Sequence, residues 1–205
     1  MLDGSDGGGK STQAPRLVEH LRTSGFERCR HFREPGGTTV GEKVRAILLD
    51  PSLAEMERAT ETFLYLAARA ELVSKEVAPA LARGEAVVCE RFLLATLVYQ
   101  GVAGGADPAL IRDCFRPAAL GVEPDLTIVL DVPPEVGLRR REGGKDRLEA
   151  RDVEFHRRVR KGYADAVRDD PLRVRCVDAG GAPDVVFDAI RREVDDVLRQ
   201  RHRPH

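Results

Sequence analysis

The sequence lacks the features that mark membrane, secreted and zinc-binding proteins. No apolar run approaches the roughly 18 residues that cross a bilayer, and the chain does not open on a basic segment followed by an apolar one, so we expect no membrane partner. The four cysteines lie far apart without a Cys-x-x-Cys pair, which argues against a zinc site and a disulfide framework (Cys29, Cys89, Cys114 and Cys176). These absences predict a cytoplasmic protein.

The sequence also has no excess of positive or negative charge. With 33 basic and 34 acidic side chains, the net charge of −1 gives no overall field for holding a nucleic-acid backbone. We therefore expect no nucleic-acid partner, and any bound anion must be held by a locally built site. No internal repeat and no long Pro- or Ser-rich linker divides the 205 residues, which predicts a single domain over residues 1–205.

Short β-branched apolar runs alternate with longer segments of helical period. This alternation predicts an α/β protein in which helices flank a parallel sheet. The clearest strands are expected at residues 86–89, 126–131 and 173–177, with a weaker one at 28–32. Helices are expected at residues 10–23, 54–83, 108–120, 152–168 and 183–199.

The first strand is the weakest part of this pattern. Only Met1, Leu2 and Asp3 precede the first glycine, whereas a parallel α/β domain normally begins with a buried strand. Either the first strand is very short, or the chain as given begins downstream of its true start.

A glycine-rich segment near the start matches the G-x-x-x-x-G-K-[ST] pattern and leads into a predicted helix. Its backbone N–H groups and the helix N-terminus can surround a polyphosphate. Lys10 would reach the β- and γ-phosphates, and the Ser11 hydroxyl would bind Mg²⁺. The pattern predicts nucleotide binding without separating kinases from switches or ATPases. The residues of this cradle are Gly4, Ser5, Asp6, Gly7, Gly8, Gly9, Lys10, Ser11 and Thr12.

Three further clusters are candidates for a second ligand. The segment 33–38, Arg-Glu-Pro-Gly-Gly-Thr, forms a turn after the weak strand, and on its own it could be an ordinary surface turn. Glu90-Arg91-Phe92 follows the strand at 86–89, where open α/β sheets bind their ligands. Tyr65 and Arg69 lie one helical turn apart, so they could stack on a planar base and bond its edge, or equally lie at the edge of the core.

Together these clusters identify a family resemblance: the chain resembles the thymidylate kinase family of P-loop nucleoside-monophosphate kinases. The resembling segments run in family order over nearly the whole chain, and the Arg-Glu-Pro-Gly-Gly and Leu-Asp-Val-Pro-Pro-Glu segments are the most specific. They are Asp6 and residues 33–38, 65–69, 79–84, 99–101, 124–127, 130–138 and 146–149. The resemblance implies a three-layer P-loop kinase fold with a parallel sheet of about five strands and a mobile basic lid, and it suggests a homodimer.

The resemblance also implies roles for individual residues. Asp6 would lie near the sugar and the acceptor phosphate, while Arg33 and Arg91 would hold the monophosphate. Tyr65 would stack on thymine and Arg69 would bond its edge. Two further positions match the lining of the nucleoside pocket, namely Thr96 and Gln100. This chain departs from the family's usual Asp-Arg-Tyr triplet at Glu90-Arg91-Phe92; Glu90 would orient Mg²⁺ through water, or orient Arg91.

The expected lid, at about residues 139–151, lies in a basic stretch. Residues 139–161 contain ten Lys or Arg and five Asp or Glu, an excess of five positive charges. Gly143 and Gly144 interrupt this stretch, as expected of a loop that can hinge. Because the cradle itself has no arginine, the resemblance implies that a lid arginine stabilises the transferred charge, with Arg147 preferred and Arg141 second.

The sequence therefore predicts transfer of the γ-phosphoryl group of Mg-ATP to dTMP, giving dTDP and ADP, in dTTP synthesis. Lys10, Glu90, Arg91, Arg141 and Arg147 are the predicted catalytic residues, and Ser11 and Glu90 the predicted metal-binding residues. Two alternatives remain open at this stage. One is a deoxynucleoside kinase, which is suggested by Glu90-Arg91 and opposed by Arg33, and the other is a nucleotide-binding homologue with weak activity.

Overall fold

A five-stranded sheet forms the centre of the computed structural model, which describes residues 1–140 and 146–201. All neighbouring strands are parallel, in the order β2-β3-β1-β4-β5. The strands are β1 (Leu2–Gly4), β2 (Cys29–Arg33), β3 (Ala86–Glu90), β4 (Thr127–Asp131) and β5 (Val174–Asp178). The predicted class, a parallel sheet flanked by helices, is confirmed.

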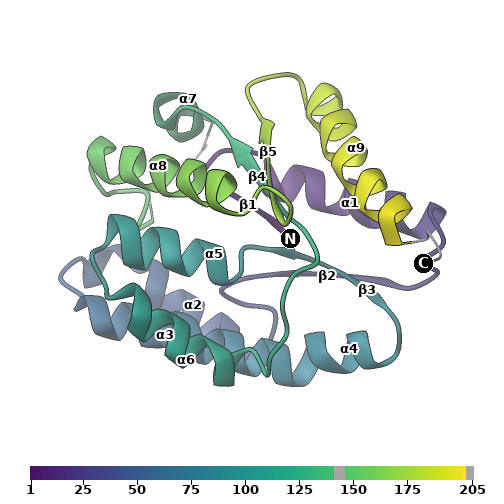
Figure 1. Cartoon of the computed structure of the whole chain (residues 1–205). Helices are drawn as coiled ribbons and strands as arrows, with labels where there is room; N and C mark the ends of the chain where they lie inside the picture. Colours follow the sequence, from purple (N-terminus) through teal and green to yellow (C-terminus); the bar gives the residue numbers. More distant parts are fainter. Residues whose placement is uncertain (141–145, 202–205) are drawn as a thin grey trace.

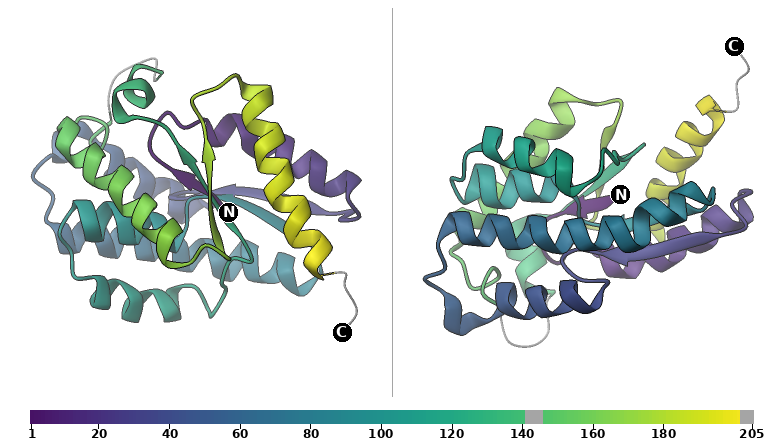
Figure 2. Two further views of the ribbon diagram at one scale, coloured as in Figure 1. Left: turned by 45° about the horizontal axis from the view of Figure 1, so that its top comes forward. Right: turned by 90° about the horizontal axis from the view of Figure 1, so that it is seen from below.

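Helices cover both faces of the sheet (Figures 1 and 2). They are α1 (Lys10–Thr23), α2 (Thr39–Leu49), η1 (Pro51–Leu53), α3 (Arg58–Leu72), η2 (Val73–Val77), α4 (Ala78–Ala82), α5 (Leu93–Thr96), η3 (Leu97–Ala103), α6 (Pro108–Ala118), α7 (Pro134–Arg139), α8 (Val153–Asp169) and α9 (Pro183–Arg201). Because side chains alternate along a strand, Ile128 and Leu130 pack towards α1 and α9, whereas Val129 packs towards α8. The sheet is therefore the middle of three layers.

The first strand has only three residues. This matches the first of the two expectations, a very short first strand. It lies at the centre of the sheet, between β3 and β4, and Leu2 pairs with both Glu90 and Ile128. Leu2 is fully buried in the core cluster beneath α1 and α9. Neighbours on both sides thus hold a strand that is too short to be stable alone.

The long helix predicted at residues 54–83 is formed by α3, η2 and α4 in succession. The middle part is a π-helical turn, in which the amide of Ala78 donates to the carbonyl of Val73. Pro79 follows directly and has no amide hydrogen, so the regular bonding pattern must change near this point. A second π-helical segment, η3, begins after α5; Thr96 at the end of α5 and Tyr99 and Gln100 in η3 line the cavity described below.

The sequence pattern did not predict α2, α5 with η3, or α7. Helix α2 begins where the side chain of Thr38 accepts a hydrogen bond from the amide of Gly41, a typical N-cap. Glu42 in its first turn accepts from the amide of Gly37 at 2.9 Å and so ties the helix to the preceding Pro-Gly-Gly turn. The turn and the helix together carry Arg33 and Arg45 to the same cavity.

Candidate active site

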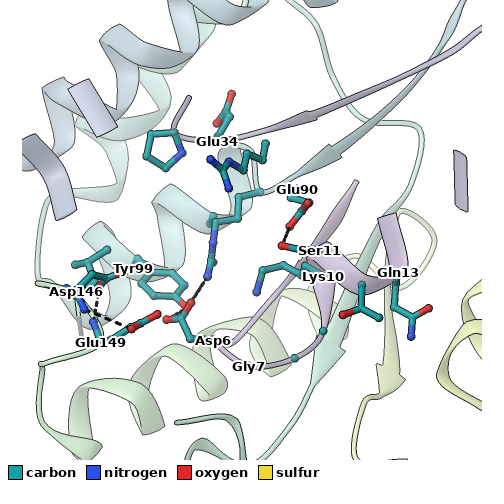
Figure 3. A pocket seen from close by; sticks show the side chains of 18 of the residues that line it. Asp6, Gly7, Lys10, Ser11, Gln13, Glu34, Glu90, Tyr99, Asp146 and Glu149 are labelled. Atoms are coloured by element: carbon teal, nitrogen blue, oxygen red, sulfur yellow. Dashed lines mark hydrogen bonds and ion pairs between the residues drawn. The ribbon is translucent and has the colours of Figure 1, made fainter. Parts of the chain in front are cut away.

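A cavity of about 570 Å³ lies at the carboxyl ends of the strands, where loops following β1, β2, β3 and β5 meet (Figure 3). Its wall contains the predicted cradle residues Asp6, Gly7, Gly8, Gly9, Lys10, Ser11 and Thr12. It also contains the predicted acceptor residues Arg33, Tyr65, Arg69, Glu90, Arg91, Thr96 and Gln100. Clusters that lie far apart in the sequence thus meet in one place.

The cradle has the backbone shape that a phosphate site needs. Gly7 and Gly9 have φ values of +72° and +86°, in the left-handed region, and α1 begins directly after Gly9. A Cβ at Gly7 would lie 2.0 Å from the carbonyl oxygen of Gly137 in α7, so only glycine fits between the cradle and that helix. The positive end of α1 therefore faces the cavity.

Lys10 is held at the mouth of the cradle by two carbonyl oxygens. Its Nζ donates to Gly4 at 3.0 Å and to Ser5 at 2.8 Å. Burial and then the nearby Arg91 guanidinium lower the pKa of Lys10 to about 7. A bound polyphosphate would favour the charged ammonium, so the lysine is placed to gain a proton when an anion binds.

Ser11 and Glu90 form the candidate magnesium site. The Ser11 hydroxyl donates to Oε2 of Glu90 at 2.6 Å, and Nε2 of His31 lies 3.0 Å from Oε1 (Figure 3 shows the Ser11 bond). Burial would raise the pKa of Glu90, but the bonds from His31 and Ser11 outweigh it and the pKa lies below its ordinary value. A hydroxyl beside an ionised carboxylate at the cradle fits Mg²⁺, which prefers oxygen ligands.

Arg91 occupies the middle of the cavity and has a fixed orientation. Its Nη2 donates to Oδ1 of Asp6 at 2.5 Å and to the Tyr99 hydroxyl at 3.2 Å (Figure 3 labels Asp6 and Tyr99). The Tyr99 hydroxyl in turn donates to Asp6 at 2.9 Å. The backbone of Arg91 has a φ of +67°, which is uncommon for a residue with a side chain and is concentrated at functional sites.

Tyr65 and Arg69, the predicted base-recognition pair, also line the cavity. Arg69 is 1% exposed and donates from Nε to Glu34 at 2.8 Å and from Nη1 to the Thr96 hydroxyl at 3.1 Å. Tyr65 lines the cavity one helical turn before it. Both residues lie at the cavity wall, and the guanidinium of Arg69 is held by Glu34 and Thr96. Base recognition by this pair stays a prediction.

Two cavity arginines were not among the predicted site residues. Arg45 in α2 lines the cavity with Arg33, donates to the carbonyl of Pro35 at 2.9 Å, and has its pKa lowered by burial and by Arg33. Arg140 lines the other end and donates to the carbonyls of Ala179 at 2.7 Å and Gly180 at 3.0 Å. No sequence signal marked Arg45, because helix α2, which carries it, was not predicted either.

The structure corrects the assignment of Arg147, which was expected to reach the transferred phosphoryl group. Arg147 is 3% exposed, does not line the cavity, and lies with Nη1 2.6 Å from Oε2 of Glu61. Its Nε donates to the carbonyl of Leu48 at 2.8 Å. A guanidinium held by a buried carboxylate and a helix-end carbonyl is a structural anchor in this arrangement. The second choice, Arg141, lies outside the described residues.

The structure shows the surroundings of Phe92, which stands where the family usually has tyrosine. Its ring is 2% exposed and packs edge-on against Phe115, with ring centroids 5.3 Å apart. The guanidinium carbon of Arg69 lies 5.1 Å from its centroid. Phe92 is thus a core residue beneath the base-recognition pair, where a hydroxyl would have to find its own hydrogen-bond partner.

A P-loop cradle and the predicted base-recognition pair that line one cavity, on a parallel α/β sheet, are typical of a nucleotide-binding phosphotransferase. The family model described as thymidylate kinase matches residues 2–190. Thymidylate kinase of Symbiobacterium thermophilum is 45% identical over 203 residues, covering 98% of this chain and 94% of that protein. The chain belongs to the thymidylate kinase family and is an ATP-dependent nucleoside-monophosphate kinase.

Further similarities agree with this assignment. Thymidylate kinase of Desulfosudis oleivorans is 46% identical over 189 residues, covering 88% of each chain. The crystal structure of thymidylate kinase from Ehrlichia chaffeensis superimposes with a TM-score of 0.76 at 30% identity, covering 96% of both chains. The family resemblance predicted from the sequence is therefore confirmed.

Proposed function

We propose that the protein transfers the γ-phosphoryl group of Mg-ATP to dTMP, giving dTDP and ADP. The observation that carries this proposal is that a polyphosphate cradle, the predicted base-recognition pair and the arginines at positions 33, 45 and 91 line one cavity. A kinase that transfers a phosphoryl group between two nucleotides must bind both of them in one cavity. The deoxynucleoside kinase alternative is not favoured, because Arg33 and Arg45 offer two cations that a substrate without phosphate would not need.

The donor would bind along the cradle. Lys10 and the backbone of residues 4–12 would hold its phosphates, and Arg140 would lie beside them. The cavity wall beyond includes Ala179, Pro183 and Val186, whose apolar surfaces suit the adenine base.

The acceptor would bind at the other end. The monophosphate would lie among Arg33, Arg45 and Arg91, whose planar guanidinium groups match phosphate oxygens. Tyr65 would stack on thymine, while Arg69 and Thr96 would bond its edge. Asp6 and Gln100 would face the sugar and the base.

The acceptor phosphate oxygen attacks the γ-phosphorus in line, so no side chain needs to act as nucleophile. The protein's main contributions are to align the two phosphates and to neutralise their charge. When bound, Mg²⁺ would neutralise the donor phosphates, and Ser11 and Glu90 are the residues that would hold it. Arg91 and Arg140, which line the cavity on either side, take the charge-stabilising role first expected of Arg147; Arg141 remains a further candidate.

We also propose a cytoplasmic homodimer without a nucleic-acid or membrane partner. None of the helices over residues 1–140 and 146–201 is both long and apolar enough to cross a membrane. The neighbouring helices α2 and α3 leave large apolar side chains exposed, including Ile47 at 44% and Phe63 at 49%, and a second copy could cover them. Sedimentation of wild type and Phe63→Glu would test this, since a dimer through this face would dissociate in the variant.

An ADP-release assay with dTMP, dUMP, thymidine or no acceptor tests the proposed reaction. Rapid ADP release that requires dTMP, with little release with thymidine, is the expected result. Comparable release with thymidine would point to a deoxynucleoside kinase. Slow release that no acceptor stimulates would point to a nucleotide-binding homologue.

A further inference from the structure

Two hydrogen bonds join helix α3 to the segment formed by α5 and η3. On α3, Glu61 and Arg69 lie four residues before and after Tyr65, so the three side chains follow one side of the helix. Arg69 donates from Nη1 to the Thr96 hydroxyl at 3.1 Å. Nε2 of Gln100 donates to Oε1 of Glu61 at 2.8 Å. Along the helix, Tyr65 therefore lies between two fixed contacts.

Glu61 is a buried carboxylate with partners on both oxygens. It is 6% exposed, and its Oε2 lies 2.6 Å from Nη1 of Arg147 and 3.6 Å from Nη2 of Arg151. Arg147 is held in turn by the carbonyl of Leu48, which accepts from its Nε at 2.8 Å. A carboxylate paired with a guanidinium has no proton to donate, so Glu61 can only accept hydrogen bonds.

Glu61 therefore decides which end of the Gln100 amide faces the cavity. The two ends of a side-chain amide have almost the same shape, so their hydrogen-bond partners determine the orientation. Because Glu61 only accepts, the NH₂ group of Gln100 must face it and Oε1 must face away. Gln100 lines the cavity, and no residue in 1–140 or 146–201 donates to its Oε1. This oxygen is left to accept from a ligand.

An acceptor oxygen in the cavity distinguishes two kinds of pyrimidine. Thymine and uracil carry a proton on N3, between two carbonyl groups, and can donate it. N3 of cytosine carries no proton and is an acceptor itself, so with cytosine two acceptors would face each other and remain unpaired. Arg69 offers only donors, which suit a ring carbonyl better than the amino group of cytosine.

We propose that Glu61, held by Arg147, is a positioning residue for base selectivity: it fixes the Gln100 amide so that Oε1 accepts from N3–H of thymine. The proposal rests on the proposed acceptor site, and it names the class of base that this site takes, a pyrimidine with a protonated N3 and a carbonyl at position 4. The Glu61–Arg147 pair thereby acts on acceptor choice without touching the base.

Glu61→Gln should reverse the Gln100 amide. Arg147 requires an acceptor, so the oxygen of the new side chain would face Arg147 and its NH₂ group would face Gln100. Gln100 would then accept through Oε1 and turn its own NH₂ group into the cavity, where it opposes N3–H of thymine and suits N3 of cytosine. Glu61→Gln/Arg147→Met removes both charges together, so it leaves no buried charge unpaired and gives the amide no fixed direction.

The test measures the dissociation constants of dTMP and 5-methyl-dCMP by titration calorimetry, with the weaker ligand measured in competition. The two nucleotides share the methyl group, sugar and phosphate and differ at N3 and position 4 of the ring. Wild type should favour dTMP at least about 100-fold. Glu61→Gln should lower this ratio roughly 5- to 150-fold, the effect of one buried polar group that loses its partner. The double variant should also lower it, by a smaller factor.

Two controls separate orientation of the amide from a structural role. Glu71→Gln, on the same helix, alters a partly exposed carboxylate that lies 2.5 Å from Nζ of Lys75, and it should keep the wild-type ratio. In a Gln100→Leu background, Glu61→Gln should change the ratio less than about twofold, because the amide that it reorients is absent. A merely structural role would weaken both nucleotides equally and leave the ratio unchanged.

The outcomes also separate this proposal from the function on which it rests. If Glu61→Gln does not fold, the double variant decides. An unchanged ratio in the Glu61 variants that fold, or an equal change in the Gln100→Leu background, would refute the role of Glu61 and leave the proposed reaction intact. A wild-type protein that binds no dTMP, or binds 5-methyl-dCMP equally well, would refute the acceptor assignment and the role of Glu61 with it.

Discussion

At the scale of single residues, Lys10 has the property that most directly connects structure to a solution measurement. Burial lowers its pKa to about 7, so at pH 8 most of the side chain is neutral. A polyphosphate raises this pKa, so binding of ATP at pH 8 should take up close to one proton. At pH 6 the lysine is already charged, so proton uptake on ATP binding should be small.

Titration calorimetry in two buffers of different ionisation enthalpy measures this proton uptake. Lys10→Met should abolish the uptake at pH 8 and lower turnover on the order of 10²-fold or more, because a charge beside the transferred group is lost. Uptake that persists in Lys10→Met would assign the proton to another group.

Tyr65 carries the prediction for the acceptor base. Tyr65→Ala removes the aromatic surface at the cavity wall and should raise KM for dTMP by roughly 5- to 150-fold, the equivalent of about 1–3 kcal/mol of stacking. KM for ATP should stay within about twofold of wild type. Tyr65→Phe keeps the ring and is the matched comparison; if it is as impaired as Tyr65→Ala, stacking is not the role of this residue.

At the scale of secondary-structure elements, α7 packs directly against the cradle. A Cβ at Gly137 would lie 2.2 Å from the backbone oxygen of Asp6, and a backbone atom cannot move aside easily. Gly137→Ala should therefore push α7 and the cradle apart and weaken binding of β,γ-imido-ATP.

Binding of dTMP is the comparison for Gly137→Ala, because most of the acceptor wall is built by α2, α3, α5 and η3, and Asp6 links that wall to the cradle. Calorimetric titration with each ligand should show a loss of at least about tenfold for the analogue and a smaller loss for dTMP. An equal loss for both ligands would mean that the variant disturbs the fold as a whole.

The strands and the longest helices could be predicted from the sequence because their signals are local. The apolar β-branched runs at 86–89 and 126–131 match β3 and β4 within one residue at each end. Helix α1 was predicted with its observed bounds, because the cradle pattern fixes where it begins. The short elements α5 and α7, with four and six residues, were missed because such lengths carry no measurable helical period.

Residue types in the site could be predicted where a local motif carries them, and not where the fold alone brings partners together. The cradle and the Glu90-Arg91 pair lie where the motifs indicated. The anchoring of Arg147 by Glu61 joins residues far apart in the chain, and no local pattern marks either one as the other's partner. The basic stretch around Arg147 therefore suggested a contact with phosphate. In the structure Arg147 instead forms an ion pair with Glu61.

At the scale of the whole molecule, basic side chains gather at the ligand cavity although the chain as a whole is nearly neutral. A chain with a net charge of −1 gathers Lys10, Arg33, Arg45, Arg91 and Arg140 around one cavity. The carboxylates that share this cavity are largely engaged with cations or hydroxyls, as Asp6 is with Arg91 and Glu34 with Arg69. The site thus places cations where two phosphate-bearing ligands would meet, among carboxylates that hold several of them in position.

The central claim is that donor and acceptor occupy this one cavity at the same time, with their phosphates facing each other. The most direct measurement is calorimetric titration with a bisubstrate ligand, adenosine joined to thymidine by five phosphates. The account predicts one ligand per chain, displacement by ATP and by dTMP, and affinity at least about 100-fold tighter than either substrate alone. Displacement by only one substrate, or affinity no tighter than that of ATP, would contradict it.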